Sequence, residues 1–200
     1  MVIFDLDGVL VDACEWHRAA LNEALREVCN YEISLEDHYN KFNGLPTKVK
    51  LDALTEMHVL SKDKHLNVYN LKQEKTKKII ESTAKIRQEK IDLLEWLLSK
   101  GITVACFTNS IRETAHLMLA KTGILRHFHM VLTNQDVKNA KPDPEGYVRL
   151  LKEFQISNKN AIIVEDSPKG LEAANAAGCR VISVKNASEV TIDLFKRILE

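Results

Sequence analysis

Four short apolar runs, separated by long helical patterns, constrain the fold of this 200-residue chain more than any other feature. They span residues 2–6, 102–107, 161–165 and 181–184, and residues 130–133 form a weaker fifth run. Each run is bounded by polar or turn residues and is rich in β-branched side chains, which is typical of strands buried on both faces of a parallel sheet. The alternation of strand and helix predicts an α/β fold with a doubly wound parallel sheet.

The helical patterns between these runs have apolar faces and recognisable ends. One face is formed by Ile111, Ala115, Met118, Leu119 and Thr122, and another by Tyr147, Leu150, Leu151 and Phe154. Ser167 followed by Pro168 has the form of an N-cap with proline at the first helical position, and Gly178 suits the position just after that helix. Gly101 is predicted in the same way to end the helix before the second strand.

Residues 12–82 follow a different pattern, because they contain helical stripes and no convincing strand. One stripe contains Ala20, Leu21, Ala24, Leu25 and Val28, a second helix contains Leu51 and Leu54, and residues 72–80 suggest a third. An excursion of about seventy residues is too long for a bare loop in a compact domain. We therefore predict an α/β core made of residues 1–11 and 83–200. A small helical cap domain, residues 12–82, would be inserted after the first strand and lie over the carboxyl end of the sheet.

The charge balance and the apolar runs exclude several classes of partner. Lys and Arg together number 28, as do Asp and Glu, and the pI is near 7.1, which favours neither nucleic acid nor an anionic membrane surface. The apolar runs are too short to span a bilayer, and the first residues lack the basic segment of a signal peptide. The four cysteines lie far apart without metal-ligand spacing, which predicts thiols in a reducing, cytoplasmic compartment.

Polar side chains follow several of the predicted strands at the points where those strands end. They are Asp5 and Asp7 after the first strand, Thr108, Asn109 and Ser110 after the second, Glu165 and Asp166 at the end of the fourth, and Lys141 before the helix that precedes the fourth. In open parallel sheets, ligands bind beyond the carboxyl ends of the strands. We therefore expect these side chains to converge on one spot.

Side chains of these types favour phosphoryl transfer. Carboxylates packed together repel one another and need a cation, and hard oxygen ligands with open positions suit Mg²⁺. A carboxylate such as Asp5 can attack phosphorus, and Asp7, two residues later, can act as general acid and then as general base. The charge on a transferred phosphoryl group requires a metal ion, a lysine such as Lys141 and hydrogen-bond donors around it.

Each motif on its own has an ordinary structural explanation. Asp-x-Asp-Gly can be a turn or part of a calcium loop, Lys-Pro-Asp-Pro can be a turn that starts a helix, and Glu-Asp-Ser can be an N-cap. These three motifs and Thr108-Asn109-Ser110 occur in order along the chain, each at the expected place beside a strand end. The combination of all four indicates a functional site.

The four motifs resemble those of the haloacid dehalogenase superfamily, in particular its branch of sugar-phosphate phosphatases and β-phosphoglucomutase-like enzymes with a helical cap. The first motif matches residues 4–12, Phe-Asp-Leu-Asp-Gly-Val-Leu-Val-Asp, and the others match residues 108–110, 141–144 and 164–167. The resemblance extends over nearly the whole chain and implies a Rossmann-like core with an inserted cap.

The resemblance implies that Asp5 is the nucleophile and a Mg²⁺ ligand. Asp7 would be the acid and base, and would give its main-chain carbonyl to the metal. The position of Asp7 resembles one that is Tyr in dehalogenases and Thr in transport ATPases, so an Asp there favours a phosphatase or a phosphomutase.

The same resemblance implies roles for the residues of the other motifs. Asp166 would bind the metal directly, and Glu165 directly or through water. Thr108 and Lys141 would hold the transferred phosphate, helped by main-chain amides near Asn109.

Four residues of the predicted cap are candidates for substrate contacts by this resemblance. They are His17 on the first cap helix, Gly44 and Thr47 in the loop 43–47, and Lys72. An ordinary, partly exposed helix position explains His17 equally well. The lysine-rich run that starts at Lys72 is more typical of a solvated helix face.

These observations predict a Mg²⁺-dependent phosphatase that hydrolyses a small phosphorylated metabolite, such as a sugar phosphate, through an aspartyl-phosphate. A hexose phosphomutase would use the same residues and pass the phosphoryl group to a sugar hydroxyl. A catalytically silent binding member would keep only the fold. We expect no nucleic-acid or membrane partner, and a monomer or a weak homodimer.

Overall fold

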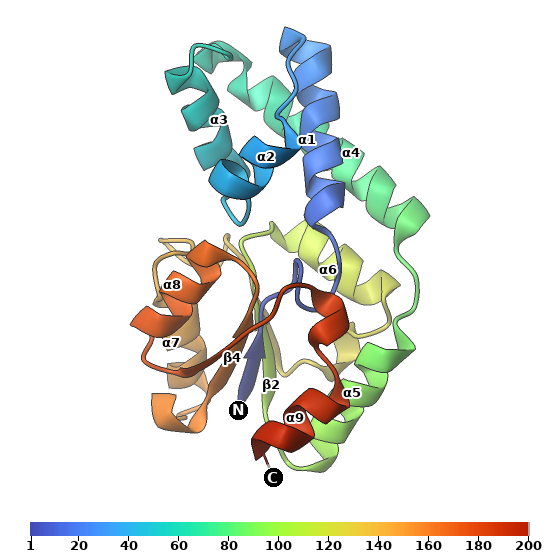
Figure 1. Ribbon diagram of the computed structural model, residues 1–200, viewed down its shortest axis with the longest axis vertical. Coiled ribbons are helices and arrows are strands. Elements are labelled where there is room, and N and C mark those ends of the chain that lie inside the picture. Colours follow the sequence, from blue (N-terminus) through green and yellow to red (C-terminus); the bar gives the residue numbers. More distant parts are fainter. Residues whose placement is uncertain (200) are drawn as a thin grey trace. The chain divides into compact units, whose positions relative to one another are not determined.

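The computed structural model describes residues 1–199, which divide into two compact units. Residues 1–12 and the chain from Lys85 onward form an α/β unit, and residues 13–84 form a helical unit (Figure 1). The chain therefore leaves the α/β unit once, soon after its first strand, and returns to it once.

Five parallel strands form the sheet of the α/β unit, in the order β3-β2-β1-β4-β5. They are β1 (Val2–Phe4), β2 (Val104–Phe107), β3 (Met130–Leu132), β4 (Ile162–Glu165) and β5 (Arg180–Ser183). The central strand β1 pairs with both neighbours, so that Phe4 lies opposite Cys106 of β2 and Val164 of β4. Because these three strands run in the same direction, their carboxyl ends lie side by side at one edge of the sheet.

Helices cover both faces of the sheet (Figure 1). The longer helices are α5 (Gln88–Ser99), α6 (Arg112–Lys121), α7 (Glu145–Glu153), α8 (Pro168–Ala176) and α9 (Ile192–Leu199), and short 3-10 turns are η3 (Leu125–His127), η4 (Asn158–Asn160) and η5 (Ala187–Glu189). Successive strand residues point to opposite faces. Ile3 therefore packs in the core under α7, with Phe107 and Tyr147, whereas Phe4 faces Phe195 of α9, with 5.7 Å between ring centroids.

The helical unit has a core of its own. Its elements are α1 (Cys14–Cys29), α2 (Leu35–Asp37), the π-helix η1 (His38–Phe42), α3 (Thr47–Glu56), the 3-10 turn η2 (Lys62–Lys64) and α4 (His65–Thr83). α1 and α4 pack along each other. The buried core of the unit includes Leu21, Ala24 and Leu25 of the predicted first stripe, and Leu51 and Leu54 of the predicted second helix.

The predicted fold class is confirmed, and each of the five predicted strands is present with ends that differ by no more than two residues. The Ser167 hydroxyl caps α8 by accepting a hydrogen bond from the Gly170 N–H at 3.1 Å, with Pro168 in the first turn, as predicted. Gly178 and Gly101 follow α8 and α5 with φ of 73° and 71°, the left-handed conformation that ends a helix. Within residues 1–199, no helix combines the length and the apolar character that crossing a membrane requires.

Candidate active site

The loop after β1 brings Asp5 and Asp7 to the carboxyl edge of the sheet. Asp5 continues the pairing of β1, because its main-chain N–H donates to the carbonyl of Val164 in β4 at 3.0 Å. Gly8 then turns the chain with φ of 93°, a conformation that a residue without Cβ adopts readily. Gly8 also leaves room for Asp166, since a Cβ there would lie 2.1 Å from Asp166 Oδ2.

Three carboxyl groups gather where β1 and β4 end. Asp5, Glu165 and Asp166 each offer an oxygen, and these oxygens all lie within 4.8 Å of one another. Asp5 and Glu165 are buried, and Asp166 is partly exposed. The three predicted metal ligands that act through side chains are therefore close together, and they offer the oxygen atoms that Mg²⁺ prefers.

Lys141 connects two of these carboxylates. Its Nζ atom donates to Asp5 Oδ1 at 2.6 Å, to Glu165 Oε1 at 2.5 Å and to the Phe107 carbonyl at 2.8 Å. Burial alone would lower the pKa of this lysine. The attraction of the Asp5 and Glu165 carboxylates outweighs burial, so the pKa of Lys141 lies well above its ordinary value. The ammonium group therefore stays charged in a buried position.

One ammonium group does not neutralise the acidic groups around it. Burial raises the pKa of Asp5 well above its ordinary value; Lys141 opposes this effect, and the neighbouring carboxylates add to it. Burial, together with repulsion from Glu165 and Asp7, raises the pKa of Asp166 to about 7. A divalent cation among the three clustered carboxylates would offset this repulsion, so the donor set fits the predicted Mg²⁺ ion.

Two hydroxyl groups from the loop after β2 hold the carboxylate of Asp7. Thr108 Oγ1 and Ser110 Oγ both donate to Asp7 Oδ2, each at 2.9 Å. The main-chain N–H of Ser110 donates in turn to Thr108 Oγ1 at 2.9 Å. The structure thus joins two predicted site residues, Asp7 and Thr108, directly. Ser110, a residue of the second motif for which the sequence predicted no separate role, contacts both of them.

Asn109 holds the main chain of Lys141. Its Nδ2 donates to the Lys141 carbonyl at 3.1 Å, and its Oδ1 accepts from the Lys141 N–H at 3.0 Å. The amide side chain therefore positions the lysine. A contact between phosphate and a main-chain amide near Asn109 stays a prediction.

Two residues that surround Glu165 were missing from the predicted site. The Tyr147 hydroxyl donates to Glu165 Oε1 at 2.6 Å, although the sequence assigned Tyr147 only to the apolar face of its helix. Gly170 of α8 leaves space for the same carboxyl group, because a Cβ there would lie 2.0 Å from Glu165 Cδ. A buried tyrosine hydroxyl normally finds a hydrogen-bond partner, and this rule is the signal that points to Tyr147.

Two candidates of the helical unit lie next to each other. His17 of α1 and Lys72 of α4 approach to 3.1 Å between Nδ1 and Nζ. Lys72 is only 7% exposed, so the interpretation of its lysine run as a solvated helix face is wrong at this position. The reason is its place on α4, since it shares the buried face of that helix with Val68 and Thr76, one turn before and after it.

The other two candidates of the helical unit lie in the loop after η1 and at the start of α3. Gly44 turns the chain with φ of 75°, and Thr47 is the first residue of α3. A substrate contact at His17, Gly44, Thr47 or Lys72 stays a prediction.

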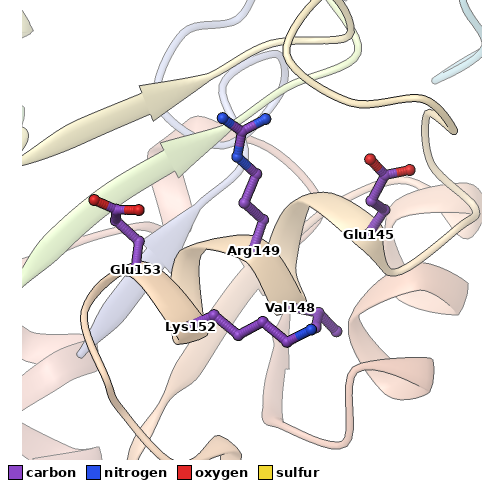
Figure 2. Close-up of a pocket in the computed structure, with 5 residues that line it drawn as sticks. All are labelled: Glu145, Val148, Arg149, Lys152 and Glu153. Atoms are coloured by element: carbon purple, nitrogen blue, oxygen red, sulfur yellow. The ribbon is translucent and has the colours of Figure 1, made fainter.

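An open hollow along α7 is a separate feature of the α/β unit. It is lined by Glu145, Val148, Arg149, Lys152 and Glu153 (Figure 2). Figure 2 shows Glu145, Arg149 and Glu153 rising from one side of the helix, with Lys152 and Val148 on another. None of the five belongs to the carboxylate cluster, and the hollow adds no residue to the candidate site.

The sequence as a whole matches a known family. Residues 2–184 match the family model described as haloacid dehalogenase-like hydrolase. The chain belongs to this family. It is 31% identical to the phosphorylated carbohydrates phosphatase of Thermotoga maritima, with 88% of this chain and 81% of the relative covered. It is 28% identical to the fructose-1-phosphate phosphatase of Escherichia coli, with 92% and 95% covered.

A solved structure shares the fold of this chain. β-Phosphoglucomutase from Clostridium difficile has a TM-score of 0.84 against this chain at 21% identity, with 98% of this chain and 95% of that structure covered. At this identity the likeness concerns the fold alone. The predicted membership of the haloacid dehalogenase superfamily is confirmed, and the relatives named as phosphatases support the predicted enzyme class, a phosphoric monoester hydrolase.

Proposed function

We propose that this haloacid dehalogenase-like hydrolase is a Mg²⁺-dependent phosphatase whose substrate is a small sugar phosphate. The observation that carries the proposal is the meeting of Asp5, Lys141, Glu165 and Asp166 at the carboxyl edge of the sheet. The names of two relatives, which act on phosphorylated carbohydrates and on fructose 1-phosphate, support the class of substrate.

The first step is the attack of an Asp5 oxygen on the phosphorus atom of the ester. The bond between phosphorus and the sugar oxygen breaks, and Asp5 becomes an aspartyl-phosphate. Lys141 lies 2.6 Å from Asp5 Oδ1, so a phosphoryl group that reaches Asp5 also meets the ammonium group. The Thr108 hydroxyl offers a hydrogen bond to the same group, because it borders the site from the end of β2.

Asp7 moves the protons in both steps. It gives a proton to the leaving sugar oxygen while Asp5 attacks. It then takes a proton from the water molecule that attacks the aspartyl-phosphate, which releases inorganic phosphate and regenerates the Asp5 carboxylate. The position of Asp7, two residues after the nucleophile on the same loop, suits this exchange.

Four residues would hold the magnesium ion. These are Asp5, Glu165 and Asp166 through their carboxylates, and Asp7 through its main-chain carbonyl. When bound, the ion supplies positive charge against the oxygens of the phosphoryl group. It also offsets the repulsion that raises the pKa values of Asp5 and Asp166.

A hexose phosphomutase would share the first step and differ in the second. A sugar hydroxyl, in place of water, would then accept the phosphoryl group from Asp5. Two of the relatives compared above are named as phosphatases, which favours water as the acceptor.

The proposed function is tested by a phosphate-release assay over a panel of phosphorylated metabolites, with and without EDTA. We expect release from sugar phosphates that EDTA abolishes. No phosphate release, with isomerised hexose phosphate appearing only after a bisphosphate is added, would replace the phosphatase with the mutase. Binding of Mg²⁺ without turnover of any ester would indicate a non-catalytic member.

A further inference from the structure

The Thr108 hydroxyl has a single hydrogen and two groups that need it. In the structure this hydrogen goes to Asp7 Oδ2, at an oxygen–oxygen distance of 2.9 Å. In the proposed reaction the same hydroxyl donates to the phosphoryl group on Asp5. A hydroxyl donates one hydrogen bond at a time, so Thr108 must release Asp7 when it turns to the phosphate.

Ser110 is placed to keep both partners ordered during this exchange. Its main-chain N–H fixes the Thr108 oxygen at 2.9 Å, so only the hydrogen of Thr108 has to swing. Its side-chain hydroxyl donates independently to Asp7 Oδ2, also at 2.9 Å. When Thr108 turns to the phosphate, this second hydrogen bond remains and still holds the carboxyl group of Asp7.

On the basis of the proposed phosphatase function, we propose that Ser110 is the positioning residue of Asp7. When Thr108 donates to the phosphate, the Ser110 hydroxyl keeps Oδ2 in place and so holds the carboxyl group of Asp7 in position for the leaving oxygen and, later, for the attacking water. Ser110 acts through Asp7 and needs no contact with the substrate for this role.

The chemistry of the leaving group separates this role from a general structural one. An alkyl phosphate needs a proton from Asp7 in the first step, because an alkoxide leaves poorly. p-Nitrophenyl phosphate loses a stable nitrophenolate without that proton, and needs Asp7 only when water attacks Asp5-phosphate. A misplaced Asp7 should therefore slow both steps for a sugar phosphate, but only the second step for the aryl ester.

The test is rapid-mixing kinetics of Ser110→Ala with p-nitrophenyl phosphate and with the best sugar phosphate. With p-nitrophenyl phosphate, we expect a burst of one nitrophenolate per enzyme at the wild-type rate, followed by turnover about tenfold slower than wild type. General acid–base catalysis contributes about 10²–10⁴-fold, and the loss should be at the low end because Asp7 is misplaced and not removed. For the sugar phosphate, kcat should fall by a similar factor while KM changes by less than about threefold, because substrate binding is untouched.

Three further variants make the result specific. Ser110→Thr keeps the hydroxyl and should restore most of the turnover, and Ser110→Cys, a weaker donor of similar size, should lie between Ala and wild type. Ser99→Ala is the matched control, because Ser99 is exposed and its hydroxyl donates within its own helix turn, to the Trp96 carbonyl at 2.7 Å. This control should equal the wild type.

The negative results for the role of Ser110 and for the phosphatase function can be told apart. A Ser110→Ala enzyme with wild-type turnover, or one whose burst slows as much as its steady state, would overturn the role of Ser110 and leave the phosphatase function standing. Wild-type protein that releases neither nitrophenolate nor phosphate would instead overturn the proposed function, and the role of Ser110 with it.

Discussion

Two buried lysines of the α/β unit have opposite surroundings. Lys141 lies at the carboxyl edge of the sheet, 2.6 Å from the carboxylate of Asp5, and is 3% exposed. Lys90 of α5 is 0% exposed, and its ammonium group donates to the carbonyls of Ala187 at 2.5 Å and Val190 at 2.6 Å. One lysine is thus surrounded by charge and the other by neutral carbonyl groups of the chain before α9.

The pKa values of the two lysines follow these surroundings. Lys141 has a raised pKa, because the attraction of its carboxylates exceeds the effect of burial. Burial lowers the pKa of Lys90 to about 8; Arg87 adds to this, and the weaker opposing effects of Glu89 and Asp12 do not cancel it. A buried ammonium can therefore serve a reaction or hold a segment of chain, and its partners show which.

The largest expected effect is the difference in kcat between variants of the two lysines. Lys141→Met should lower kcat by about 10³-fold, because it removes one preorganised donor to the charge of the transferred phosphoryl group. Lys90→Met should leave kcat within about threefold of wild type, because the ammonium group of Lys90 donates to the main-chain carbonyls of Ala187 and Val190, which lie outside the candidate site. Steady-state kinetics of both variants checks this, and equal losses in the two would contradict the functional distinction.

The second effect concerns the pH dependence of stability. In the folded protein Lys90 loses its proton near pH 8, whereas in the unfolded chain it does so near its ordinary value of 10.5. Between these values the unfolded chain binds more protons, so Lys90 makes the free energy of unfolding rise with pH. The rise that Lys90 contributes from pH 8 to 9.5 should be about 1.5 kcal/mol, at 1.36 kcal/mol for each pKa unit.

Urea unfolding at pH 7, 8 and 9.5 measures this contribution as the difference between wild type and Lys90→Met. Lys121→Met, at an exposed helix end, is the control and should follow the wild-type pH dependence. If the difference in free energy of unfolding between wild type and Lys90→Met is the same at all three pH values, the prediction that the pKa of Lys90 is lowered is wrong.

The smallest effect concerns the Glu165 oxygen that Lys141 contacts. Tyr147 and Lys141 donate to the same oxygen of Glu165, at 2.6 Å and 2.5 Å. Tyr147→Phe keeps the packing and removes one donor, so the affinity for Mg²⁺ should fall about tenfold, as is usual when a supporting hydrogen bond to a metal ligand is lost. Turnover at saturating Mg²⁺ should stay within about threefold of wild type. Titration of activity with Mg²⁺ checks this. An unchanged Mg²⁺ concentration at half-maximal activity would contradict the role of Glu165 as a metal ligand.

Much of the fold was predictable from the sequence, because local rules decide it. The apolar runs locate the strands, and Ser167, Pro168 and Gly178 mark both ends of α8. Parallel strands end at the same edge, so the positions of Asp5 and Glu165 in the sequence were enough to predict that they meet. The assignment of residues 12–82 as a cap stays a prediction.

What the sequence did not predict are contacts between elements far apart in the chain. Periodicity assigned Tyr147 to an apolar face, but not the rotation of α7 that aims its hydroxyl at Glu165. It likewise gave no sign that Ser110 reaches Asp7, more than a hundred residues earlier. Lys72 was misjudged because its lysine-rich neighbours suggested solvent, whereas packing of the helix buries this one side chain.

The most direct test of phosphoryl transfer through Asp5 is to trap the intermediate. The enzyme, mixed with Mg²⁺ and a sugar phosphate that it hydrolyses, is quenched in acid during turnover, digested and examined by mass spectrometry. We expect one phosphoryl group on the peptide that contains Asp5 in the wild type. Asp5→Asn, which keeps the shape and removes the nucleophile, should give neither this adduct nor measurable turnover. Wild-type-like turnover by a folded Asp5→Asn variant would contradict the covalent mechanism.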